Sequence, residues 1–266
     1  MGRKTNKNMS ENFKMIAKTF YGFEDVLSEE LLALGAQKIN KGNRNVSFYG
    51  DKGFLYKSNL SLRTALKILK PVCEFRFKDI NEYYDNIYSF KWEDYIGPTG
   101  SFLINSVVFH SHVFNNSKFT SLKAKDAIVD RFRDKFKKRP SINSFNPELK
   151  IEIHVNRSTC TISLDSSGES LHKRGYKKYN SAAPLNEVLA AGIVLMSKWD
   201  KKSDLLDPMC GTGTFLIEAA MIAKNIAPNL NRLSFAFEKW KDWDNELFEI
   251  IEESVRSKEI GFDYKL

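Results

Sequence analysis

The sequence has few cysteines, few glycines and no long apolar run, and each scarcity excludes a class of protein. Its three cysteines, Cys73, Cys160 and Cys210, are widely spaced and form no CxxC pair, so neither a disulfide framework nor a zinc site is expected. With 14 glycines in 266 residues and no heptad repeat, collagen and coiled coil are excluded. No apolar stretch approaches the roughly 18 residues of a membrane span, and residues 1–12 lack the apolar core of a secretory signal. We therefore expect a cytoplasmic protein with no membrane partner.

What is abundant is positive charge, because the net charge is +8 and hydrophobic residues still make up 42% of the chain. That hydrophobic content excludes a disordered tail. Residues 131–139 hold six basic residues against one acid, and residues 172–179 mix tyrosines with cations. Such runs are usually solvated surface, but cations also contact phosphates and aromatic faces stack on unpaired bases. His110 and His112 could share a strand face, but without a third ligand no metal site is predicted.

The hydrophobic pattern divides the chain into three parts. Apolar and alternating runs predict strands over residues 13–20, 46–48, 101–109, 149–155, 159–164, 204–207 and 258–263. Apolar residues at helical spacing predict helices over residues 24–34, 54–67, 121–136, 183–198 and 215–224. Gly35 is placed to end the first helix in a left-handed conformation. The order strand, helix, strand, helix predicts a small α+β unit first, and a second unit begins near Pro71.

The clearest chemical signal lies in the loop that joins the strand predicted before Pro208 to the next helix. Its glycines, Gly211 and Gly213, permit positive φ and let a ligand approach the backbone closely. The loop lacks the lysine of a P-loop, and Leu216 replaces the third glycine of a dinucleotide fingerprint. A GxG pair alone can be a structural turn. The longer string is more specific: Asp207-Pro208-x-x-Gly211-x-Gly213-Thr214, followed by Glu218.

This string resembles motif I of the Rossmann-like methyltransferases that use S-adenosylmethionine. Three more stretches, in the same order, are similar to the THUMP-domain RNA methyltransferases of the bacterial 23S ribosomal RNA guanine-N2 type: residues 120–132, 167–176 and 182–187. The resemblance covers nearly the whole chain. It implies a fold with α+β ferredoxin-like and THUMP modules, followed by the start of an α/β Rossmann-like methyltransferase domain. The implied divisions are residues 13–70, 71–166, a basic linker over 167–181, and 182–266.

The resemblance also implies site residues. The loop should wrap the methionine end and ribose of S-adenosylmethionine, residues 182–187 should shape the methionine pocket, and an acid at a strand end should bind the ribose hydroxyls. The cofactor-binding residues implied are Pro184, Asn186, Glu187, Asp207, Pro208, Met209, Cys210, Gly211, Thr212, Gly213, Thr214 and Asp263. The RNA-binding residues implied are Thr120, Lys123, Lys125, Arg131, Arg139, Lys173, Arg174 and Tyr176. Without the resemblance, the basic helix would be read as a solvated amphipathic helix.

One feature of the family is missing from the sequence. No Asn-Pro-Pro-Tyr tetrapeptide is present, the motif whose polar groups hold the target amine and whose ring stacks on the extruded base. No catalytic residue is therefore assigned, and the chain is expected to be the front of a longer enzyme that alone binds the cofactor weakly. The predicted function is methyl transfer to a guanine N2 of structured, ribosomal RNA. Two alternatives stay open: a non-catalytic THUMP RNA-binding protein, and an adenine-N6 methylase.

Overall fold

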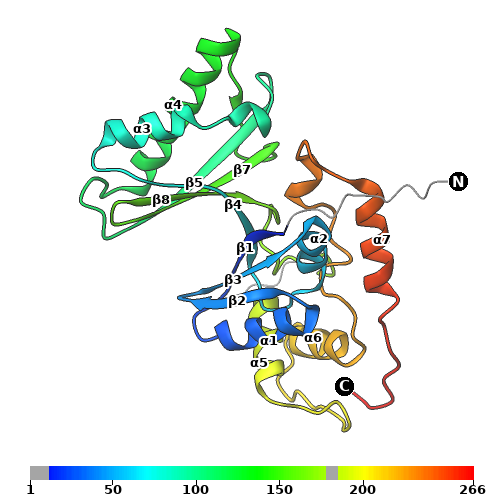
Figure 1. The fold of residues 1–266 in the computed structure, drawn as a ribbon. Coiled ribbons are helices and arrows are strands. Elements are labelled where there is room, and N and C mark those ends of the chain that lie inside the picture. Colours follow the sequence, from blue (N-terminus) through cyan, green and yellow to red (C-terminus); the bar gives the residue numbers. More distant parts are fainter. Residues whose placement is uncertain (1–11, 178–184) are drawn as a thin grey trace, which may run out of the picture.

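The computed structural model describes residues 12–177 and 185–266, and a mixed eight-stranded sheet organises the first of these segments (Figure 1). The strand order is β2-β3-β1-β4-β8-β7-β5-β6, and every pairing is antiparallel except those that β5 makes with β6 and β7. The strands are β1 Phe13–Lys18, β2 Gln37–Gly42, β3 Asn45–Gly50, β4 Lys67–Arg76, β5 Ser101–Phe109, β6 Ser141–Ile142, β7 Leu149–Asn156 and β8 Thr159–Asp165.

Seven α-helices accompany the sheet within the described residues. They are α1 Glu24–Leu34, α2 Lys52–Ser61, α3 Ile80–Ser89, α4 Ser117–Phe136, α5 Glu187–Met196, α6 Thr214–Ala223 and α7 Asn245–Arg256. Short polar side chains begin several of them: Asp51, Asp79 and Asn116 each accept a hydrogen bond from a first-turn N–H group. Gly35 ends α1 with φ +96°, as predicted. In the part of the chain that the structure describes, no helix is both long and apolar enough to cross a membrane.

Strand β4 joins the first two modules into one sheet. Its first residues, Lys67–Leu69, pair with β1, and the rest of the strand pairs with β8 on its other side. The sequence placed a helix over 54–67 and a module boundary near Pro71. The helix ends at Ser61 instead, and Pro71 lies inside β4 at an irregularity in the register. A bulge is a place where a strand can accept proline, because the missing N–H group is not needed there.

The segment after residue 185 packs against the first module, as Figure 1 shows for α7 beside α2 and for α5 near α1. Tyr56 of α2 meets an aromatic cluster formed by Phe237, Trp243 and Phe248, with ring centroids 4.7–5.7 Å apart. Gly192 lets α5 approach closely, because a Cβ there would lie 2.2 Å from the ring of Phe23. The buried core is therefore continuous from the sheet into the C-terminal segment.

Two strands predicted for this segment do not form. Residues 204–207 and 258–263 have no strand geometry, although the Leu205 N–H group donates to the Lys265 carbonyl at 3.0 Å. A strand is stabilised by a ladder of such bonds and by neighbours on both edges, and this pair has a single backbone bond. The helix predicted over 183–198 is α5, which begins at Glu187, and residues 183 and 184 lie outside the described residues. The helix predicted over 215–224 is confirmed as α6.

Candidate functional site

The loop between Asp207 and α6 is shaped by its two glycines. Gly211 has φ +52° and Gly213 has φ +71°, and the Gly213 N–H group donates to the Cys210 carbonyl at 2.7 Å. No side chain caps α6, so N–H groups of its first turn are left for a ligand. A Cβ on Gly213 would meet nothing within 4 Å, and the Met209 side chain is 90% exposed. The loop therefore presents open main chain to solvent, as a nucleotide-type ligand requires.

The Asp207 carboxylate has one satisfied and one unsatisfied oxygen. Its Oδ1 atom accepts a hydrogen bond from the Met209 N–H group at 3.0 Å. Its Oδ2 atom is buried and has no hydrogen-bond partner among the described residues. In proteins, leaving a buried carboxylate oxygen without a hydrogen-bond donor costs roughly 1–3 kcal/mol. A ligand hydroxyl or ammonium group would satisfy it, so this oxygen fits the predicted cofactor site.

The start of α5 forms one wall of a cavity next to the linker. Asn186 caps the helix, because its Oδ1 atom accepts from the Val188 and Leu189 N–H groups at 3.0 and 3.2 Å. Glu187 is 5% exposed and forms an ion pair with Lys177 at 2.8 Å. Both residues line a cavity of about 380 Å³ beside the linker. Their assignment to the cofactor stays a prediction, and Pro184 lies outside the described residues.

The remaining predicted cofactor residues are less enclosed. Pro208, Cys210 and Thr212 are exposed, and the Thr212 hydroxyl lies 2.9 Å from that of Thr214, which is buried at the start of α6. Asp263 is exposed in the segment that follows α7, and no hydrogen bond or ion pair joins its side chain to another described residue. Its role at the ribose stays a prediction.

Arg174, predicted to contact RNA, lies instead in a buried junction between the modules, and Tyr176, for which RNA contact stays a prediction, is half-buried beside it. Arg174 is 1% exposed and donates to the carbonyls of Leu171 and Arg63 at 2.9 and 2.6 Å. Its Nε atom lies 3.4 Å from Oε1 of Glu218, and the Tyr176 hydroxyl donates to the same oxygen at 3.0 Å. Burial raises the pKa of Glu218, and Arg174 opposes that rise. The prediction for Arg174 is wrong, because a buried guanidinium with these partners cannot reach RNA.

The predicted basic face of α4 is also partly structural. Thr120 is fully buried, and its hydroxyl donates to the Asn116 carbonyl at 3.0 Å. Arg131 donates through Nε and Nη2 to both carboxylate oxygens of Glu93, at 2.8 and 2.7 Å, and holds the Tyr88 carbonyl as well. The hydrogen bond from Arg131 lowers the pKa of Glu93. The prediction is therefore wrong for Thr120 and Arg131, whose polar groups bind the neighbouring structure.

Four predicted RNA contacts do lie at the surface. Arg139 is exposed, and the Lys123 ammonium lies 5.9 Å from the centre of the Phe119 ring. Lys125 pairs with Asp126 at 2.8 Å, and Lys173 pairs with Glu169 at 2.9 Å. Exposed pairs of this kind contribute about 0–1 kcal/mol, so a phosphate can replace the carboxylate at little cost. For these four residues RNA binding stays a prediction.

A basic groove between the first two modules was not predicted. It has a volume of about 730 Å³, and the cationic or titratable side chains that line it are Lys18, Arg44, His110 and His154. Among the residues that the structure describes, no aspartate or glutamate lines it. The Phe109 ring, 49% exposed, lies 5.5 Å from the imidazole of His154. Burial lowers the pKa of His154, and Lys18 acts in the same direction. In the sequence, His110 was considered only together with His112 as a possible metal pair, and no metal site was predicted from them.

Three family models match the chain in sequence. They are the RlmL ferredoxin-like domain over residues 14–69, the THUMP domain over 77–165, and the RMKL-like methyltransferase domain over 174–264. These matches confirm the predicted fold class of ferredoxin-like, THUMP and methyltransferase modules in that order. The eight-stranded sheet spans the first two matches.

Similar proteins align with most of this chain. A ribosomal RNA large subunit methyltransferase K/L from Syntrophotalea carbinolica is 37% identical over 95% of this chain and 36% of its own length. The protein of that name from Cellvibrio japonicus is 40% identical over 89% and 32%. A solved structure, SMU.472, assigned as a methyltransferase and complexed with SAH, has a TM-score of 0.82 and 34% identity over 94% and 66%. The chain thus spans about a third of the K/L relatives and two thirds of the solved protein. In sequence order, the chain thus matches the RlmL ferredoxin-like domain, the THUMP domain and the RMKL-like methyltransferase domain, and it is similar to methyltransferases over most of its length.

Proposed function

We propose that this chain captures RNA and binds S-adenosylmethionine within a methyltransferase that acts on guanine N2 of large-subunit ribosomal RNA. The unpartnered Oδ2 atom of Asp207, next to the open glycine loop, carries the cofactor part of the proposal. The K/L relatives support ribosomal RNA as the substrate, and the SAH complex of SMU.472 supports the cofactor. Guanine N2 rests on the resemblance of the four sequence motifs.

The chain's own residues would hold the cofactor in a defined way. The Asp207 carboxylate would accept hydrogen bonds from ligand hydroxyl or ammonium groups, and uncapped N–H groups in the first turn of α6 would be left for the ligand. When bound, S-adenosylmethionine supplies an electrophilic methyl group on a sulfonium. The protein's contribution is then to position the base nitrogen against that methyl group and to hold the loop still during transfer.

The RNA part of the proposal rests on where the accessible cations lie. The groove between the modules carries Lys18 and Arg44 without a lining carboxylate, and α4 presents Lys123 and Lys125 at the surface. Phosphates attract such surfaces at long range, and each phosphate contact makes binding weaker with salt. The buried partners of Arg174 and Arg131 remove those two arginines from the binding surface but stabilise the modules that present it.

Titration calorimetry with S-adenosylmethionine tests the loop. Replacing Gly211 by valine places a β-branched side chain at φ +52°, so the loop must change shape and binding should be lost. Gly97→Val is the matched control, because Gly97 has no positive φ and a Cβ there meets nothing within 4 Å. If Gly211→Val binds as tightly as the parent, the loop is not the cofactor site.

Fluorescence anisotropy with ribosomal RNA fragments tests the basic face. A Lys123→Gln/Lys125→Gln variant should bind more weakly and lower the salt slope by roughly 1.4–1.8, from about 0.7–0.9 per lost phosphate contact. Lys41→Gln is the control, since Lys41 is also exposed and paired, at 2.5 Å with Asp25. An unchanged slope would remove α4 from the RNA surface.

Nucleoside chromatography identifies the target atom. Because this chain lacks the tetrapeptide that holds the target amine, large-subunit ribosomal RNA is incubated with labelled S-adenosylmethionine and with this chain joined to a segment that carries the tetrapeptide, then digested to nucleosides. Label in N2-methylguanosine supports the proposal, whereas label in N6-methyladenosine assigns the chain to adenine methylation.

A further inference from the structure

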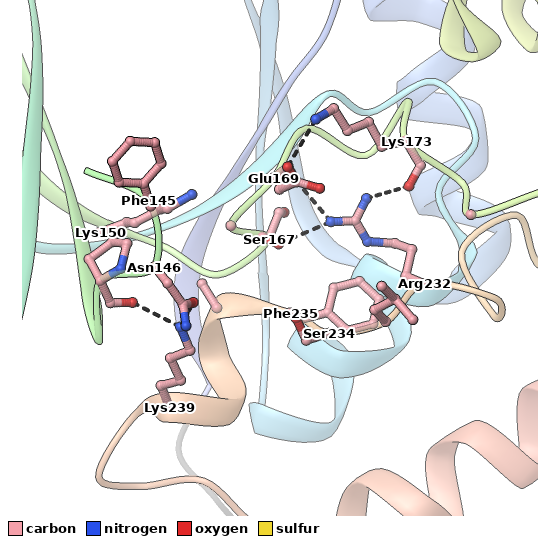
Figure 2. A pocket seen from close by; sticks show the side chains of 15 residues that line it. Phe145, Asn146, Lys150, Ser167, Glu169, Lys173, Arg232, Ser234, Phe235 and Lys239 are labelled. Atoms are coloured by element: carbon pink, nitrogen blue, oxygen red, sulfur yellow. Dashed lines mark hydrogen bonds and ion pairs between the residues drawn. The ribbon is translucent and has the colours of Figure 1, made fainter. Parts of the chain in front are cut away.

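A further cavity, separate from the cavity at α5 and from the basic groove, lies where the THUMP module, the linker and the methyltransferase segment meet (Figure 2). Its volume is about 340 Å³, within the range of small-ligand pockets. Its walls come from residues 145–150, from residues 167–175, and from the turn that leads into the short helix Ala236–Lys239. We call this cavity the junction pocket. Figure 2 shows Phe145 and Lys150 on one side of it, with Glu169, Lys173 and Arg232 across from them.

The junction pocket is positively charged. Four cations line it, Lys150, Lys173, Arg232 and Lys239, against the single carboxylate of Glu169. The carboxylate shows their combined effect, because its pKa is lowered, first by the hydrogen bond from Lys173 and then by the charges of Lys173, Arg232 and Lys150. One acid cannot neutralise four cations, so the pocket favours an anionic ligand.

Two of these cations hold the walls in place. Arg232 donates to the carbonyls of Ser170 and Lys173 at 3.0 and 2.7 Å, and further to those of Ser167 and Glu169. Lys239 donates to the Asn146 side chain and to the Pro147 carbonyl. These bonds tie the methyltransferase segment to the linker and to the THUMP module, so the pocket is fixed by the fold.

The other two cations are available to a ligand. Lys150 extends from β7 and forms no hydrogen bond or ion pair with another described residue. Lys173 is held only by its ion pair with Glu169, in which the side chains are 56% and 64% exposed. A pair with that exposure contributes little free energy, and an incoming phosphate can take over the ammonium group.

An exposed aromatic ring lies on the same side of the pocket as Lys150 (Figure 2). Phe145 is 97% exposed, although its turn is ordered: the Phe145 and Asn146 N–H groups both donate to Oδ1 of Asn143 at 3.0 Å. Lys239 holds the Asn146 side chain from the other module. A phenylalanine that packs against nothing, on a turn fixed from two sides, is a platform on which an unpaired base can stack.

We propose that the junction pocket binds a nucleotide of single-stranded RNA, with the base on Phe145 and the phosphate at Lys150 and Lys173. The inference rests on the proposed function, because it takes RNA as the ligand of the THUMP module. An acidic peptide shares the charge of RNA, but it offers no base to use the exposed ring. The pocket would lead an unpaired strand from the THUMP module toward the methyltransferase segment.

Fluorescence anisotropy with a fluorescein-labelled oligouridylate of about 12 nucleotides tests the pocket on the 266-residue chain. Phe145→Ala should weaken binding about tenfold, equivalent to roughly 1.4 kcal/mol, and should leave binding of duplex RNA within about twofold, since paired bases cannot stack on the ring. Lys150→Gln/Lys173→Gln should lower the salt slope by about 1.4. Tyr21→Ala and Lys41→Gln are matched controls: Tyr21 is 78% exposed, and the pair of Lys41 with Asp25 is as exposed as that of Lys173.

The outcomes separate the two proposals. If both junction-pocket variants bind like the parent while Lys123→Gln/Lys125→Gln binds less, the pocket inference fails and the proposed function stands. If the parent binds no RNA, both fail. If polyglutamate binds as tightly as the oligouridylate and is equally sensitive to Phe145→Ala, the pocket takes an acidic peptide, and the inference is overturned.

Discussion

The buried ion pair between Arg174 and Glu218 offers a quantitative test of how the modules are joined. In Arg174→Met, the Glu218 carboxylate loses its cation, and the carbonyls of Leu171 and Arg63 lose their donor. Removing one partner of a buried pair generally costs about 3–5 kcal/mol. Arg63 remains as a second cation near the carboxylate, which favours the lower end, about 3 kcal/mol. With a urea slope of about 2–3 kcal/mol/M, the unfolding midpoint should fall by roughly 1–1.5 M.

The same variant has a pH signature that a simple packing loss would not produce. Burial already raises the pKa of Glu218, and loss of Arg174 raises it further above the unfolded value of about 4.3. A carboxyl whose folded pKa is raised stabilises the fold below the unfolded pKa, and that stability is lost as pH rises through the folded pKa. The deficit of Arg174→Met against the parent, measured by circular dichroism in urea, should therefore be smaller at pH 5 than at pH 8.

A second substitution separates the charge from the packing. Arg174→Met/Glu218→Gln removes both charges of the pair and keeps an oxygen that can accept from the Tyr176 hydroxyl, so it should regain about half of the lost free energy. Three results would each show that the Arg174–Glu218 pair does not join the modules as described. They are a loss of unfolding free energy below about 1 kcal/mol in Arg174→Met, an equal deficit at both pH values, and no recovery of stability when Glu218→Gln is added.

Two further substitutions test other contacts by urea unfolding. Gly175→Ala should destabilise the chain by about 2–4 kcal/mol, because Gly175 has φ +91° and a Cβ would lie 2.3 Å from the Asn231 carbonyl oxygen. The control Gly97→Ala should stay within about 0.5 kcal/mol of the parent. Equal losses of stability in the two variants would contradict the close approach at Gly175. Arg131→Met should cost about 1–2 kcal/mol at pH 7. Arg131 lowers the pKa of Glu93, so the parent loses this stabilisation as pH falls below about 4.3, and the variant, in which Lys135 still binds Glu93, loses less of it. An identical acid dependence in both proteins would show that the Arg131–Glu93 contact does not stabilise the THUMP module.

The elements that the sequence predicts well are those whose signals are local. Helix α1 begins and ends where the apolar spacing and Gly35 place it, and β5 matches its predicted range of 101–109. Strands β7 and β8 differ from their predicted ranges by a single residue at one end. In each case the residues that decide the structure lie within the element or next to it.

Other elements depend on distant partners and leave little trace in the sequence. Strand β2, with the sequence QKINKG, is almost entirely polar and forms because it pairs with β3 at the edge of the sheet. For β2, tertiary contacts override local preference. Helix α3 was also not predicted, although its signals are local: Asp79 caps its first turn, and Tyr83 and Ile87 lie four residues apart on its buried face.

The candidate sites also differ in whether their residues lie close together in the sequence. The glycine loop is contiguous, so its residues can be read from one motif. Charge alone does not reveal burial: Arg174 and Arg131 look like RNA contacts until Glu218 and Glu93, 44 and 38 residues away, are placed beside them. The basic groove and the junction pocket draw their cations from several separate segments, so no single stretch of sequence announces either one.

The way the modules are joined bears on how RNA would be presented to the cofactor loop. Strand β4 is shared by the first two modules, Arg232 and Lys239 tie the C-terminal segment to both the linker and the THUMP loop, and Tyr56 enters its aromatic cluster. Separate modules on a flexible linker would have to search for a productive arrangement with each RNA. Modules that share a sheet and buried polar contacts hold their surfaces at a fixed separation. RNA bound at the surface of one module is therefore already positioned at the surface of the neighbouring module. Loss of the Arg174–Glu218 pair should therefore weaken RNA positioning even though neither residue touches RNA.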